Sequence, residues 1–292
     1  MSADLFRPAG TLTNGPDPVA VDPVEAGWDY CGLRVWSFTG GQTRTLQTGD
    51  NEAVLVPLSG SFRLEADDDM FELDGREDVF AAVTDVIYLP PRSTGELTAP
   101  DGGELAMATA PADQGHPPRR FDAAEIAIEI RGSGMATRQV NNLLSADIAH
   151  AERIIVVEVL TPEGNWSSWP PHKHDEWSDC EVPLEEIYYF RVQGEGGFGL
   201  HRTYTKDRTI DATVTVHDGD VFLIPRGYHG PCVAAPGHHL YYLNVMAGPG
   251  DERVWKACDD PAHAWVRRSW DGIEPDPRLP LTEPRGDAWR QL

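Results

Sequence analysis

Two histidines and a glutamate in the second half of the chain have the types and spacing of a metal site. His172 and His174 lie two residues apart in PPHKHDEW, and on a strand such a pair projects to one face. Glu186 follows twelve residues after His174, at the start of an alternating apolar segment. That spacing leaves room for a loop and an antiparallel return. We therefore expect the two imidazoles and the carboxylate to converge on one point.

A third imidazole, His229, comes from the segment GDVFLIPRGYHG. Pro225 fixes φ at the end of a predicted strand and Gly227 permits a tight reversal, so the backbone itself places His229. Three imidazoles and a carboxylate suit Zn²⁺, Mn²⁺, Fe²⁺, Co²⁺ or Ni²⁺, and spacing does not choose among them. We predict one divalent metal per chain, with zinc as the first choice. The predicted ligands are His172, His174, Glu186 and His229.

Short strands must position these side chains. The chain has 28 glycines and 24 prolines, which punctuate brief apolar runs and predict many strands joined by tight turns. The two halves also echo one another: NEAVLVPLSG resembles EEIYYFRVQG in layout, and DVIYLPPRSTG resembles DVFLIPRGYHG. We predict an all-β protein with two barrels, and a Pro-rich linker near 112–122. The predicted segments are a barrel over 1–118, a metal-binding barrel over 119–250 and a wrapping tail over 251–292.

Composition restricts the partners. The chain carries 47 acidic against 24 basic residues, a formal charge of −23, which disfavours nucleic acids and anionic membranes. No apolar run approaches the ~20 residues that span a bilayer, and the N-terminus lacks the pattern of a signal peptide. Four scattered cysteines without a CxxC pair predict no disulfide framework and a reducing compartment. We expect a cytoplasmic protein.

The order of these motifs resembles the two signatures of the cupin superfamily. The first is His-x-His followed by Glu, and the second is Gly-x5-Pro-x-Gly with a His, here beginning at Gly219. The gap before Glu186 is longer than usual, which leaves Glu185 as an alternative ligand. The resemblance favours Glu186, because Glu-Ile-Tyr-Tyr commonly begins this cupin strand. It also implies a metal-free first barrel, since no histidine precedes His116 and the position matching His229 reads PPRST.

Longer phrases resemble the family of 5-deoxy-glucuronate isomerases of myo-inositol catabolism, a bicupin family of two jelly-roll barrels related to 4-deoxy-5-ketouronate isomerase. The phrases that carry the resemblance are RQVNNLL (138–144), GNWSSWPPHKHD (164–175), LEEIYYFRV (184–192), DGDVFLIPRGYHGP (218–231), LYYLNVMAGP (240–249) and HAWVRRSWDGIEPDPRLPL (263–281). The resemblance implies a metal-dependent isomerisation of 5-deoxy-D-glucuronate to 2-deoxy-5-keto-D-gluconate. It also leads us to expect a homo-oligomer.

That reaction needs an acid–base group and a cation for the substrate's carboxylate. Glu186, Tyr188 and Tyr204 are the candidates for proton transfer, and a hydride shift stays open. Arginine suits a carboxylate better than lysine because its fork can bind both oxygens. The candidate carboxylate-binding residues are Arg202, Arg226, Arg138 and Lys173.

Three other functions fit part of the pattern. A cupin dioxygenase would use the same three histidines and glutamate to hold Fe²⁺. A 4-deoxy-5-ketouronate isomerase would share both barrels and the metal. A sugar-binding or storage cupin would need no reaction at all, but the intact ligand set argues against it.

Overall fold

The computed structural model of the chain describes residues 5–66 and 69–285. Residues 1–4, 67–68 and 286–292 lie outside this description. They include the first residues of the N-terminus on which the signal-peptide expectation rests, and the end of the predicted tail. Within the described ranges no helix is both long and apolar enough to cross a membrane.

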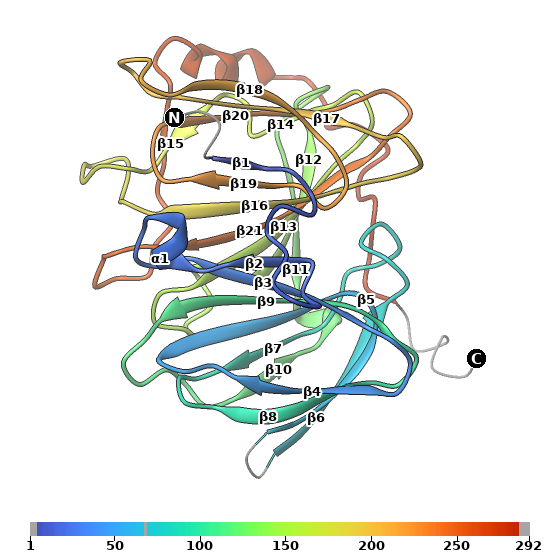
Figure 1. Ribbon diagram of the computed structural model, residues 1–292. Helices are drawn as coiled ribbons and strands as arrows, with labels where there is room; N and C mark the ends of the chain where they lie inside the picture. The colour runs from blue at the N-terminus through green and yellow to red at the C-terminus, as the bar shows by residue number, and fades with distance from the viewer. Residues whose placement is uncertain (1–4, 67–68, 286–292) are drawn as a thin grey trace.

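The structure is almost entirely β-sheet and consists of two barrels, stacked one above the other in Figure 1. The first barrel is the lower one, in blue to green. It contains β2 (Val19–Val21), β3 (Gly32–Phe38), β4 (Gln42–Gln47), β5 (Asn51–Ala66), β6 (Asp69–Arg76), β7 (Val86–Leu89), β8 (Thr94–Ala99), β9 (Gly103–Pro111) and β10 (Arg119–Phe121). The long strand β5 pairs with β7 and β9 in one layer and with β6 and β8 in the other, so it joins both layers.

The second barrel has a seven-stranded and a six-stranded layer. The first of these contains β1 (Phe6–Arg7), β11 (Ala127–Arg131), β12 (Arg138–Leu144), β13 (Ile155–Thr161), β16 (Glu185–Val192), β19 (Val221–Ile224) and β21 (Leu240–Ala247). The other contains β14 (Trp166–Ser167), β15 (His172–Lys173), β17 (Gly199–Tyr204), β18 (Asp211–Val216), β20 (Tyr228–Ala234) and β22 (Cys258–Asp259). Helical structure is limited to α1 (Pro23–Ala26) and the 3₁₀ segments η2 (Ala123–Glu125) and η3 (Ala264–Trp270). The all-β, two-barrel prediction is confirmed.

The two barrels exchange strands. β1 at the N-terminal end pairs with β19 of the second barrel. β10, from the end of the predicted linker, pairs with β7 of the first. The sheets therefore interlock across the boundary predicted at residue 118.

The repeat seen in the sequence has a structural counterpart at two glutamates. Glu52 on β5 accepts hydrogen bonds from the backbone N–H groups of residues 152–154 in the second barrel. Glu185 on β16 accepts three from residues 29–31 in the first. Each barrel thus fastens a loop of the other at the same point of its fold, as in a duplicated unit.

The largest apolar core lies between the barrels and draws on both. Val54 and Val56 of β5 and Ile187 and Tyr189 of β16 belong to it, and all four are buried. The alternate residues of the same strands point to the barrel interiors. One face of each strand therefore joins the barrels, and the other face is available to fill or line a barrel.

A buried ion pair crosses this core. Arg76 on β6 binds Glu158 on β13, and both side chains are fully buried. Arg76 also donates to the carbonyls of Pro57 and Ala82, while Tyr241 donates to Glu158 over 2.8 Å. Burying an ion pair gains little by itself, but removing one partner leaves an uncompensated charge in a low-dielectric core.

We expect Arg76→Met to lower the free energy of unfolding by about 3–5 kcal/mol, because it strands the carboxylate of Glu158. Urea denaturation followed by circular dichroism measures this loss. Arg63→Met is the matched control: its pair with Glu65 is 47% and 63% exposed, and breaking it should cost less than ~1 kcal/mol. Equal losses in the two variants would contradict the assignment.

Candidate metal centre and its cavity

Strand pairing in the second barrel brings the predicted ligands together. His172 on β15 lies directly opposite His229 on β20. His174 follows β15 immediately, and Glu186 is the second residue of β16. The segments that carry the four predicted ligands therefore lie side by side in the structure, and three of the four side chains converge.

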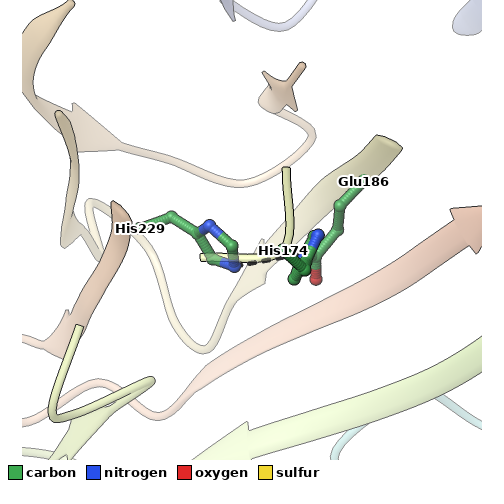
Figure 2. Close-up of side chains that lie close together, drawn as sticks. All are labelled: His174, Glu186 and His229. Carbon is green, nitrogen blue, oxygen red and sulfur yellow. Dashed lines mark hydrogen bonds and ion pairs between the residues drawn. The ribbon is translucent and has the colours of Figure 1, made fainter. Parts of the chain in front are cut away.

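Three of these side chains meet at one buried point, shown in Figure 2. The Nε2 atom of His174 lies 3.0 Å from Oε2 of Glu186, and Nε2 of His229 lies 3.1 Å from the same oxygen. Ligand atoms of the three residues all lie within 4.8 Å of one another. All three residues are buried, with His229 fully so.

Backbone carbonyls orient both imidazoles. Nδ1 of His174 lies 3.0 Å from the carbonyl of Leu184, and Nδ1 of His229 lies 3.1 Å from the carbonyl of Gly227. Donation from Nδ1–H leaves Nε2 of each ring as the lone-pair donor that faces Glu186, a common arrangement behind metal-binding histidines. Within the described ranges, Nε2 of His229 is the buried side-chain N or O atom with no hydrogen-bond partner. Such an orphaned atom suits a metal ligand.

His172 lies beside this group. Its ring centroid is 4.5 Å from that of His229 and 6.3 Å from that of His174. It does not belong to the set whose ligand atoms all lie within 4.8 Å, but it lines the adjoining cavity. The structure therefore offers three converging ligands, two of them imidazoles, and a third imidazole next to them.

Two of the candidate ligands have the charge state that a metal needs, and a third is held by its carboxylate partner. Burial acts to raise the pKa of Glu186, but His229 and His174 outweigh it and hold that pKa well below its usual range. Burial, together with the neighbouring imidazoles, lowers the pKa of His172 well below its ordinary value. Burial acts to lower the pKa of His174, but Glu186 outweighs it and raises that pKa, so a divalent cation that binds there displaces a proton from this pair.

The structure also separates the two candidate glutamates. Glu185 accepts hydrogen bonds of 2.8–2.9 Å from the backbone N–H groups of residues 29–31, on the side of the first barrel. Glu186, one position later on the strand, points to the opposite face and meets His174 and His229. Glu186 is thus the residue placed to bind a metal, and Glu185 fastens the barrels.

A cavity of about 360 Å³ opens next to the three ligands. Glu186, His172 and Tyr188 form part of its wall. The rest of the wall comes mainly from the inward faces of β11, β12, β13 and β21, and includes Arg138, Asn142, Tyr242 and Asn244. The volume suits a small, hydroxyl-rich molecule with one end near the ligand set.

Arg138 is the predicted carboxylate-binding residue that the structure places in this cavity. It donates a hydrogen bond to the carbonyl of Ala136, over 3.4 Å. Within the described residues no carboxylate lies within 4.0 Å of its guanidinium. Desolvation, with the neighbouring Arg131 and Arg267, lowers the pKa of Arg138 to about 10. A partly buried cation with no carboxylate in direct contact favours the arrival of an anion.

Three other predicted residues lie elsewhere. Arg202 pairs with Asp211, and its guanidinium lies 4.5 Å from the ring centroid of Tyr204. Arg226 is exposed and donates to Thr209. Neither lines the cavity, because both project from the outer side of the six-stranded layer or its turns. The structure does not bring them to the ligand set.

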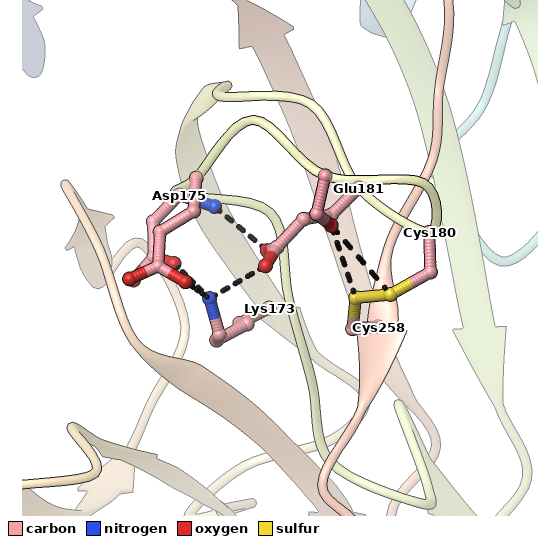
Figure 3. Close-up of a disulfide and its surroundings, with 7 residues drawn as sticks. Lys173, Asp175, Cys180, Glu181 and Cys258 are labelled. Carbon is pink, nitrogen blue, oxygen red and sulfur yellow. Dashed lines mark hydrogen bonds and ion pairs between the residues drawn. A yellow bond between two sulfur atoms is a disulfide. The ribbon is translucent and has the colours of Figure 1, made fainter.

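Lys173 has a different environment. Its ammonium group donates to Asp175, Glu176 and Glu181 over 2.5–3.0 Å (Figure 3). Asp175 in turn accepts from the backbone N–H of Gly227, over 2.7 Å. Lys173 therefore helps to hold the corner that precedes His229, and it faces away from the cavity.

The two tyrosines proposed for proton transfer also separate. Tyr188 lines the cavity, and burial raises its pKa well above the ordinary value, so its phenol stays protonated. The hydroxyl of Tyr204 donates to Asp260, and the residue does not line the cavity. Tyr242, which the sequence analysis missed, lies beside Tyr188 with ring centroids 4.9 Å apart. Tyr242 and Asn244 lie two residues apart in LYYLNVMA, and this spacing could have identified both as residues of the cavity wall.

Among the described residues, the first barrel has other side chains where the second has its ligands. β5 begins like β16, and the register that places Glu186 opposite Ile224 places Ala53 opposite Leu89. Ala53 thus stands where the second barrel has its glutamate. Apolar side chains fill this interior, among them Trp36, Phe62 and Leu97. The metal-free first barrel stays a prediction.

One prediction about the cysteines is wrong. Cys180 and Cys258 form a disulfide between residues 78 positions apart (Figure 3). The tail strand β22 pairs with β15 and so brings Cys258 beside the loop that contains Cys180. This contact depends on the path of the tail, which the spacing of the cysteines does not encode. Cys31 and Cys232 are free and buried.

Comparison with known proteins agrees with the resemblance. The KduI/IolB family matches residues 5–266. A protein of Geobacillus thermodenitrificans named 5-deoxy-glucuronate isomerase is 44% identical over 254 residues, which cover 86% of this chain and 91% of the relative. The protein of the same name from Bacillus subtilis strain 168 is 38% identical over 240 residues, covering 81% of this chain and 88% of the relative.

Solved structures show the same fold. An IolB-like protein from Salmonella typhimurium LT2 has a TM-score of 0.85 at 36% identity, covering 90% of this chain and 98% of that one. The oxalate decarboxylase of Lactobacillus farciminis has a TM-score of 0.60 at 12% identity, covering 82% of each chain. This second likeness extends to the fold alone.

Proposed function

Because this chain belongs to the KduI/IolB family, we propose that it is a metal-dependent isomerase that converts 5-deoxy-D-glucuronate into 2-deoxy-5-keto-D-gluconate. The observation that carries the proposal is one cavity that offers both a candidate metal-ligand set and a cation. His174, Glu186 and His229 converge beside it, and the unpaired guanidinium of Arg138 lines it. An aldose with a terminal carboxylate has the functional groups to use both.

The ligand set fits a divalent metal. Two oriented imidazoles, an adjacent third one and an ionised carboxylate are donors that suit zinc, and His229 has a buried nitrogen with no other partner. Bound there, a divalent ion would polarise the substrate's carbonyl and orient the neighbouring hydroxyl. His172, His174, Glu186 and His229 are the residues that would hold it.

Residues of the cavity wall would bind and orient the substrate. Arg138 binds the carboxylate and so fixes the direction of the sugar chain. Tyr188 donates a hydrogen bond from a phenol that burial keeps protonated, since its pKa is raised, while the hydroxyl of Tyr242 donates to Ser167 over 3.0 Å and its ring forms part of the wall. The reaction moves the hydrogen of C2 to C1 and the proton of the C2 hydroxyl to the carbonyl oxygen at C1, with no change in composition. Glu186 and Tyr188 remain the residues nearest to that exchange, whether the hydrogen moves as a proton or as a hydride.

The test offers the purified protein 5-deoxy-D-glucuronate and follows both substrate and product by ¹H NMR, with and without a chelator. We expect isomerisation without oxygen uptake, and its loss when the metal is removed. Turnover of 4-deoxy-5-ketouronate in preference would move the assignment to the sister isomerase. Oxygen consumption without isomerisation would move it to a dioxygenase, and turnover unaffected by chelation would refute the metal.

A further inference from the structure

The segment that follows the second barrel reaches the cavity. Residues 251–270 contain β22 and η3, and η3 lies at the top of Figure 1 in red. Two of their side chains, Trp255 and Arg267, line the same cavity as Arg138 and His172. Part of the cavity wall therefore comes from the tail and not from the barrel.

Several contacts fix this segment to the metal-binding side of the barrel. Asp259 on β22 pairs in register with His172 on β15. The disulfide joins the neighbouring Cys258 to the loop between His174 and Glu186. Tyr204 donates to Asp260, next along the chain. The tail is thus held at the residues that carry the predicted ligands.

Arg267 occupies a particular position in this arrangement. It binds both carboxylate oxygens of Asp259, the residue opposite His172. Its side chain is still half exposed, so the guanidinium is accessible from the cavity. The ion pair orients the group without burying it.

Three arginines line this cavity in a chain of net charge −23. Arg131 pairs with Glu129 over 2.7 Å, and Arg267 pairs with Asp259. Arg138 has no such partner, and the charges of Arg131 and Arg267 add to desolvation in lowering its pKa. Glu129, Asp147 and Glu186 also line the cavity, so the place that favours an anion is beside Arg138, where no carboxylate is in direct contact and two further guanidinium groups lie near.

Trp255 adds an apolar surface at the same place. Its ring lies 5.5 Å from the guanidinium carbon of Arg131 and 6.0 Å from the ring of His172, and the residue is 40% exposed. The indole therefore spans the interval between the arginines and the ligand set. A flat apolar face there can pack against the C–H face of a sugar.

We propose that Arg267 and Trp255 form the far side of the substrate site, and that Arg267 shares the substrate's carboxylate with Arg138. This inference rests on the proposed function for the identity of the substrate. It makes the C-terminal segment the element that selects sugar acids over neutral sugars. Charge-assisted, paired hydrogen bonds from two guanidinium groups give that selection its strength.

The test compares Arg267→Gln with Arg268→Gln in the metal-loaded, full-length protein. Arg268 is the next residue, is exposed, and does not line the cavity. KM and kcat for 5-deoxy-D-glucuronate are measured first. Calorimetric titration with D-glucuronate, and with D-glucose as the neutral probe, then reports binding without turnover. Thermal unfolding shows whether each variant is folded.

We expect Arg267→Gln to raise KM and the Kd for D-glucuronate about tenfold, with kcat within about threefold of the original. Arg268→Gln should change neither, and D-glucose should bind both variants equally. Arg267→Lys keeps the charge but loses the forked guanidinium, so its KM and Kd should fall between those of Arg267→Gln and Arg268→Gln. It takes the place of Arg267→Gln in the test if that variant does not fold. Unchanged KM and Kd in folded Arg267→Gln would overturn the inference.

Failure of the proposed function would give a different result from failure of the inference about Arg267. The original protein would then not isomerise 5-deoxy-D-glucuronate, while D-glucuronate binding would still depend on Arg267 if the anion site is real. Absence of D-glucuronate binding to the original protein would refute the carboxylate site itself.

Discussion

Replacing His229 by alanine is expected to abolish bound metal and to lower turnover of 5-deoxy-D-glucuronate by roughly 10³-fold or more, since a Lewis-acid metal is worth several kcal/mol. The imidazole is fully buried, and its Nε2 lies 3.1 Å from Glu186, where no other side chain replaces it. Elemental analysis of the purified variant and an NMR assay measure the two effects. The fold should survive, because a small residue at this place opens space into a neighbouring cavity.

His238→Ala is the matched control. His238 is partly exposed and its Nδ1–H donates to the carbonyl of Gln193 over 2.8 Å, away from the ligand set. We expect its metal content and turnover to equal those of the original protein. Full activity in a folded, metal-free His229→Ala variant would show that the reaction does not depend on this site.

The second large effect is expected at Arg138. Arg138→Gln removes the partly buried guanidinium that has no carboxylate within 4.0 Å among the described residues, and should lower kcat/KM by about 10²–10³-fold. Most of that loss should appear in KM, because the carboxylate is remote from the carbons that exchange hydrogen. Steady-state kinetics across a range of substrate concentrations separate the two parameters.

Arg202→Gln and Arg226→Gln are controls from the same list of predicted residues. Arg202 pairs with Asp211, and Arg226 donates to Thr209, so neither group faces the cavity. Their kinetic constants should stay within about twofold of the original. If Arg202→Gln lost as much as Arg138→Gln, the carboxylate would bind outside the cavity described above.

Short-range patterns indicated where the candidate ligands lie, for a physical reason. A Pro–Gly corner places His229, and the His-x-His spacing brings His172 and His174 to the same region, although the structure gathers only His174 with Glu186 and His229. Alternation alone could not choose between Glu185 and Glu186, because it does not say which face of the strand meets the first barrel. That choice came from the resemblance, and in the structure Glu185 faces the first barrel while Glu186 meets His174 and His229.

Long-range contacts could not be read in this way. Arg138 was one of four cations that the sequence could not rank, since its position depends on how β12 pairs with β13 across the barrel. The disulfide and the cavity residues Trp255 and Arg267 depend on a tail whose path is set by tertiary contacts, and the tail has little regular structure to reveal it. Local sequence indicates which face a residue occupies, but not which distant segment covers that face.

The two barrels resemble a duplicated unit, but they have different roles. Glu52 and Glu185 keep the same structural task, each fastening a loop of the other barrel. At the next position Ala53 has replaced the ligand that Glu186 provides, and the first interior is filled with apolar side chains. The first barrel therefore contributes stability, through the shared core and the Arg76–Glu158 pair, while the second contributes the site.

The most direct measurement is a metal titration of the chelated protein with 5-deoxy-D-glucuronate as substrate. We expect turnover to be absent at the start, to rise in proportion to added zinc or another divalent ion, and to reach its maximum at about one equivalent per chain, as a single three-His, one-Glu site requires. The same titration of His229→Ala should restore nothing. Full turnover before any metal is added, or equal reactivation of the variant, would contradict a metal-dependent isomerase site in the second barrel.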